Sequence, residues 1–155
     1  MTTMNKLENG RAEYSYEMAE EGKRIQKEAL KIHRNYYFDH QYKSYVKKTP
    51  MFIKTNGLGA TIAFMLSKKN NKIKKGKKPG EKENPKNAYD LIYMQISYWF
   101  KDERNIHKFD FDDFSKELCK MDSQQYRAIT TETLALFSWL RRFAEGLIEG
   151  DSNDG

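Results

Sequence analysis

Residues 126–147 read YRAITTETLALFSWLRRFAEGL. Apolar side chains recur in this stretch every three or four residues, which is the spacing of one face of an α-helix. The residues on this face are Tyr126, Ile129, Thr133, Leu136, Phe137, Leu140, Phe143, Ala144 and Leu147. Just before it, Asp122 and Gln125 have the spacing of a capping box. The sequence therefore predicts a long, capped amphipathic helix whose apolar stripe must be covered by other helices.

The rest of the chain predicts further helices and no strands. Helical spacing indicates helices over about residues 11–36, 41–54, 58–68, 85–101 and 111–120. Asn84 before Pro85 is a helix-start signal, and Asp110 would cap the short helix after it. Pro50 lacks a backbone donor, so a kink or restart is expected near Thr49. These patterns predict an all-α, single-domain bundle of about six helices over residues 1–149.

Positive charge is concentrated in one segment. Between Lys68 and Lys86 there are nine lysines and two glutamates, a net charge of +7 in a chain of net charge +6. Residues 69–83 contain almost no apolar side chains, which predicts a mobile loop, and residues 150–155 should form a disordered tail. A basic segment on a nearly neutral body favours binding to a polyanion such as RNA or DNA.

The sequence predicts a cytoplasmic protein without a membrane segment. Its single cysteine, Cys119, has no partner within the chain and is expected to be a buried thiol in a helix. Charged residues near the N-terminus exclude the uncharged core of a secretory signal. The longest nearly uncharged run, residues 55–67, is shorter than the roughly 20 residues that cross a bilayer.

No residue pattern predicts catalysis, a metal site or a cofactor. Asp110, Asp112 and Asp113 resemble magnesium ligands, but acids at this position are more typical of helix capping. The three histidines lie in different segments without metal-ligand spacing. A helix-turn-helix is also disfavoured, because residues 58–68 would offer mainly apolar side chains to the bases.

Residues 36–48 alternate aromatic residues with lysines, a pattern found in single-strand binding grooves. The alternative interpretation is that the aromatic side chains belong to the core. In that case Tyr42, Tyr45 and Val46 would be buried, and Lys43, Lys47 and Lys48 would face water. The lysines would then remain free to contact phosphates.

Two segments together resemble a known family. Residues 45–67 read YVKKTPMFIKTNGLGATIAFMLS and are similar to the central signature of the small subunit of the type III-B CRISPR Cmr effector complex. Tyr126-Arg127, Leu134-Ala-Leu136 and the segment WLRRFAEGL, residues 139–147, are similar to the last helix of that family. The lysine-rich loop after Ser67 departs from the pattern expected for this family.

The resemblance implies a non-catalytic structural subunit of an antiviral ribonucleoprotein. Several copies would stack in a filament beside the Cmr backbone and large subunits, along the guide RNA and target RNA. By position in the matched motifs, the expected RNA-binding residues are Lys47, Lys48, Lys54, Lys68, Lys69, Arg141 and Arg142. Pairing of Arg141 and Arg142 with Glu145 is the alternative. An independent helical nucleic-acid-binding protein and a pure protein scaffold are the other functions left open.

Overall fold

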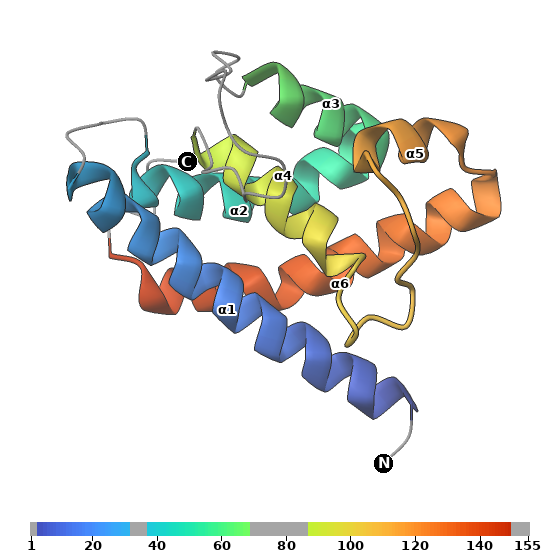
Figure 1. The fold of residues 1–155 in the computed structure, drawn as a ribbon, viewed down its shortest axis with the longest axis horizontal. Helices are drawn as coiled ribbons and strands as arrows, with labels where there is room; N and C mark the ends of the chain where they lie inside the picture. Colours follow the sequence, from blue (N-terminus) through green and yellow to red (C-terminus); the bar gives the residue numbers. More distant parts are fainter. Residues whose placement is uncertain (1–2, 32–36, 69–86, 150–155) are drawn as a thin grey trace.

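The computed structural model describes residues 3–31, 37–68 and 87–149, which form six α-helices and no strand (Figure 1). The helices are α1 (Thr3–Lys31), α2 (Asp39–Asn56), α3 (Leu58–Lys68), α4 (Ala88–Trp99), α5 (Phe114–Lys120) and α6 (Ser123–Leu147). The predicted all-α, single-domain fold is confirmed. The expected lysine-rich loop, the Asn84-Pro85 start signal and the C-terminal tail lie outside the described residues.

The two longest helices, α1 and α6, cross each other, and both begin on the same side of the molecule (Figure 1). The Ser15 hydroxyl donates a hydrogen bond to the Leu136 carbonyl oxygen at 3.3 Å. As predicted, the Asp122 carboxylate caps α6 by accepting from the Gln125 amide at 2.8 Å. The first helix was predicted to begin at about Arg11, whereas α1 already begins at Thr3.

α2 continues through Pro50, so the predicted restart near Thr49 is wrong. Val46 and Ile53 are buried on either side of the proline, and their packing holds both halves in one helix. The Thr49 hydroxyl also donates to the Tyr45 carbonyl oxygen at 2.6 Å. Tertiary packing here outweighs the local cost of a proline inside a helix.

Aspartate and asparagine side chains cap the starts of α4 and α5. The Asn87 side chain accepts from the Asp90 amide at 3.0 Å and caps α4, which begins at Ala88. α5 begins at Phe114, later than predicted. α5 is capped by Asp113, which accepts from the Ser115 hydroxyl at 2.7 Å and from the Lys116 amide at 3.3 Å. The capping interpretation is therefore confirmed for Asp113 and wrong for Asp110.

Cys119 is exposed, so the expectation of a buried thiol is also wrong. α5 is only seven residues long and buries one narrow face, formed by Phe114 and Leu118. Cys119 follows Leu118 directly, and consecutive helical residues point about 100° apart. The thiol therefore lies away from the core, with its sulfur 3.4 Å from the Ser115 carbonyl oxygen.

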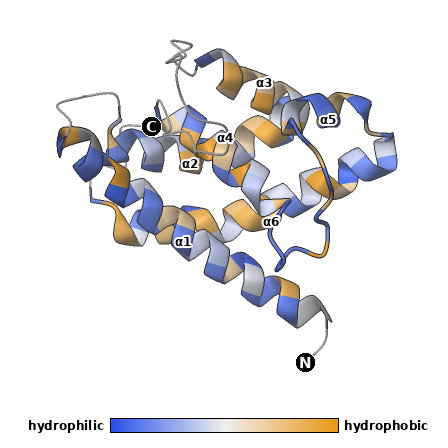
Figure 2. Cartoon of the chain, in the orientation of Figure 1, coloured by the Kyte–Doolittle hydropathy of each residue, from blue (hydrophilic) through white to orange (hydrophobic). Residues whose placement is uncertain are grey.

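The core lies between the helices and is largely aromatic and aliphatic. Its largest fully buried side chains include Tyr42, Leu58, Ile62, Leu91, Ile96, Trp99, Phe100 and Phe137. Hydrophobic residues dominate α3 and α4, whereas α1 and α6 alternate hydrophobic and hydrophilic residues (Figure 2). This difference explains why the longer helices carry most of the charged surface that solvent or a partner can reach.

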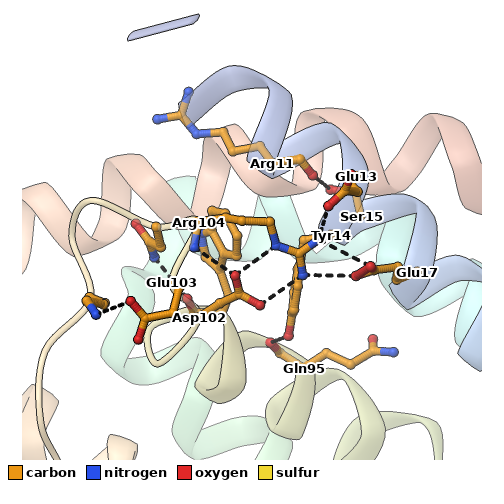
Figure 3. A network of polar contacts seen from close by, with 12 residues as sticks. Arg11, Glu13, Tyr14, Ser15, Glu17, Gln95, Asp102, Glu103 and Arg104 are labelled. Atoms are coloured by element: carbon orange, nitrogen blue, oxygen red, sulfur yellow. Dashed lines mark hydrogen bonds and ion pairs between the residues drawn. The ribbon is translucent and has the colours of Figure 1, made fainter. Parts of the chain in front are cut away.

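A polar network attaches the segment after α4 to α1 (Figure 3). The Arg104 guanidinium donates to Asp102 within its own segment and to Glu13 and Glu17 on α1, at 2.5 to 2.9 Å. These hydrogen bonds raise the pKa of Arg104, and the hydrogen bond from Arg104 lowers the pKa of Asp102. Both groups therefore stay charged, and the segment is fixed to the helix.

Candidate nucleic-acid interface

α2 and α6 are antiparallel neighbours. The Lys43 ammonium, near the start of α2, donates to the carbonyl oxygen of Ile148, which follows the end of α6, at 3.2 Å. One turn further along α2, Lys47 pairs with Glu145 of α6 at 3.2 Å. Along the pair, residue numbers increase in α2 and decrease in α6. Side chains that are far apart in the sequence therefore lie next to each other on these two helices.

Five of the seven predicted RNA-binding residues lie on these two helices. They are Lys47, Lys48 and Lys54 on α2, and Arg141 and Arg142 on α6. Lys47 is partly exposed and the other four are exposed. We call these five residues the basic face. The two helices are neighbours, so cations that are up to 95 residues apart in the sequence lie on one pair of helices.

The sequence left open whether Glu145 would pair with the two arginines. In the structure Glu145 pairs with Lys47, whose side chain is 28% exposed. Within the described part of the chain, neither Arg141 nor Arg142 has a carboxylate partner. The basic face therefore contains one internal carboxylate and retains four cations that are free to meet an anion.

The other two predicted residues lie elsewhere. Lys68 is exposed at the end of α3, with its ammonium 5.5 Å from the centre of the Phe64 ring. α3 lies beside α2 because Phe64 stacks on Phe52 with ring centres 5.4 Å apart. Lys68 therefore belongs to a neighbouring helix and not to the α2–α6 pair. Lys69 lies outside the described residues.

Tyr42 and Tyr45 of α2 pack in the core, which is the alternative that the sequence left open. Tyr42 and Val46 are fully buried, and Tyr45 stacks on Tyr89 with ring centres 3.9 Å apart. Burial raises the pKa of Tyr89 to about 12, so this phenol is neutral at physiological pH. The expectation that Lys43 faces water is wrong, because its side chain is buried against the end of α6.

The two sequence segments that resembled one family also meet at the turn between α2 and α3. Gly57 has a φ of 91°, a conformation that favours glycine, and it separates α2 from α3. The Gly59 amide then donates to the Tyr126 hydroxyl at 2.7 Å. A Cβ at either glycine would come within 3.3 Å of that oxygen. The sequence predicted Tyr126 only as part of the apolar stripe of its helix, so this link to the α2–α3 turn was missed.

Within the described residues, every helix is either too short or too polar to cross a lipid bilayer. Comparison with family models gives a match to the CRISPR-associated protein family Cas_Cmr5 over residues 7–147. This match includes both segments that meet at Tyr126 and all residues of the basic face. The chain therefore belongs to the small-subunit family of the type III-B CRISPR Cmr complex.

Proposed function

We propose that this chain is a non-catalytic structural subunit that holds the guide and target RNA of the Cmr complex by their phosphates, in antiviral defence against foreign RNA in the cytoplasm. The observation that carries the proposal is the basic face. Four of its five cations have no carboxylate partner among the described residues, and all five project from two helices packed as neighbours.

The proposed mechanism is electrostatic. Lysine and arginine side chains that neutralise phosphates release condensed counterions, which makes binding strongly dependent on salt concentration. Phosphate contacts position a protein on nucleic acid without reading its sequence. Guide pairing would supply the specificity, so this subunit needs no contacts with base edges.

The proposal includes stacking of several copies beside the backbone and large subunits. Membership of the family supports association with the Cmr complex. Exposed apolar side chains on different elements support additional protein contacts. These include Tyr16 and Leu30 on α1, Met51 on α2 and Ile106 after α4. Met51 is 67% exposed and lies in the same helix as Lys48 and Lys54.

A charge-reversal experiment tests the RNA contacts. The Lys48→Glu, Arg142→Glu double variant, assembled into a reconstituted complex with guide RNA, should lose at least tenfold in affinity for complementary target RNA at moderate salt. The matched control is Lys23→Glu, Arg24→Glu, which makes the same charge change on exposed residues of α1. Target capture by the Lys48→Glu, Arg142→Glu complex that equals the control would reject the proposed phosphate contacts.

The exposed apolar side chains also favour a second function, that of a pure protein scaffold. A scaffold would enter the complex equally well at low and high salt and would give no crosslinks to RNA. A subunit that holds RNA by its phosphates should instead give crosslinks from α2 and α6 to the guide or target strand. Crosslinking with the assembled complex therefore separates the two functions.

A further inference from the structure

Arg127 is an exposed cation that the sequence reading did not include among the RNA-binding residues. It lies in α6, 18 residues before Glu145. At 3.6 residues per turn, 18 residues make about five complete turns, so the two side chains leave the helix in the same direction. Glu145 points toward α2, where it pairs with Lys47. Arg127 therefore lies on the side of α6 that faces α2.

A contact by the adjacent residue identifies what lies next to Arg127. The Tyr126 hydroxyl accepts the hydrogen bond from the Gly59 amide, so this end of α6 lies against the turn between α2 and α3. Lys54 is three residues before the turn glycine, Gly57, and is exposed. Arg127 and Lys54 therefore lie toward the same end of the α2–α6 pair, whereas Arg141 lies toward the other end of α6.

The described residues also provide no carboxylate partner for Arg127. Within the described residues it makes no ion pair with a carboxylate, whereas Arg11 and Arg104 are both held by several. An exposed arginine of this kind keeps all its donors available for an external anion, and the planar guanidinium suits a phosphate.

We infer that Arg127 is a further phosphate-binding residue, which extends the basic face along the whole of α6. This inference rests on the proposed function. Arg127 and Arg141 are 14 residues apart, or roughly 21 Å along the helix axis at 1.5 Å per residue. The extended face would then follow the RNA backbone over that distance and contact several successive phosphates.

The test measures target-RNA affinity of the reconstituted complex at several salt concentrations, with full-length Arg127→Gln, Arg127→Lys and Arg141→Gln chains. Loss of one phosphate contact should reduce the slope of log affinity against log salt by about 0.7 to 0.9 for each copy that contacts RNA. Arg127→Gln should show this reduction, and Arg127→Lys should restore most of the slope because it keeps the charge. Arg24→Gln, on α1, is the control for loss of one exposed arginine.

The outcomes separate this inference from the proposed function. A wild-type slope for Arg127→Gln together with a reduced slope for Arg141→Gln overturns the assignment of Arg127 alone. Wild-type slopes for both Arg127→Gln and Arg141→Gln reject phosphate binding by the face and the inference with it. A reduced slope that Arg127→Lys fails to restore indicates a structural effect of the substitution and also overturns the assignment.

Discussion

The Tyr126 hydroxyl links two segments that are 67 residues apart in the sequence. It accepts a hydrogen bond from the first turn of α3, where backbone amides have no partner within the helix. The two glycines of the α2–α3 turn leave room for the ring. This contact joins the turn to α6 at the end of the helix pair where Lys54 and Arg127 lie.

Removing that hydroxyl should destabilise the protein. Tyr126→Phe keeps the ring but leaves the Gly59 amide without its acceptor, so the free energy of unfolding should fall by about 1 kcal/mol. Urea denaturation followed by circular dichroism measures this change. Tyr16→Phe is the matched control, because Tyr16 is exposed and its hydroxyl makes no hydrogen bond within the described residues. Equal losses in the two variants would show that the Gly59 contact contributes nothing.

At the scale of an element, the short helix α5 depends on its cap. The Asp113 carboxylate accepts from the Ser115 hydroxyl and from the Lys116 amide. The Ser115 hydrogen bond is the main cause that lowers the pKa of Asp113 below its usual value. A lowered pKa in the folded state means that the charged form stabilises folding, and the contribution is lost when the carboxylate is protonated.

The cap therefore predicts an acid-dependent stability. The contribution of Asp113 is complete above the unfolded-state pKa of about 3.9 and falls as the pH drops through the lower folded-state value. Asp113→Asn retains a good capping side chain, so it should match the wild type near neutral pH and lose less stability on acidification. Thermal unfolding between pH 7 and pH 2 measures this difference. If Asp110→Asn, at an exposed position that caps no helix, had the same effect, Asp113 would not be its cause.

At the scale of the whole molecule, one buried carboxylate joins three helices. Glu132 of α6 is 1% exposed. It accepts two hydrogen bonds of 2.8 Å from Arg11 of α1 and one of 3.1 Å from the indole of Trp99 in α4. These hydrogen bonds to Glu132 raise the pKa of Arg11, so the guanidinium stays charged. His107 also approaches Glu132, at 3.7 Å.

Removal of Arg11 should therefore destabilise the entire bundle. Arg11→Ala would leave the buried Glu132 carboxylate without its cation, which costs about 3 kcal/mol in comparable sites. Arg24→Ala breaks only surface pairs with Glu21 and Glu28 on the same helix, so it should change stability by less than about 1 kcal/mol. Chemical denaturation of both variants gives the comparison. If the two variants had similar stabilities, the Arg11–Glu132 pair would not join the helices energetically.

The sequence alone determined most of the helices and the cap of α6, because these depend on residues within one or two turns of each other. The apolar stripe of α6 and its Asp122 cap both agree with the structure. It also identified the five cations of the basic face as separate residues. The start of α5 at Phe114 was predicted less accurately, because several aspartates close together could have served as the cap.

Only the tertiary structure decided which side chains lie together. The burial of Lys43 and Glu132, the exposure of Cys119 and the choice of Lys47 as the partner of Glu145 all depend on how separate helices pack. The contact between Gly59 and Tyr126 also joins distant segments. Helical periodicity shows on which face of a helix a side chain lies. It does not show which other helix packs against that face. That relation is set by packing of the whole core, so the sequence determines which residues are charged and the fold determines which of them lie on neighbouring helices.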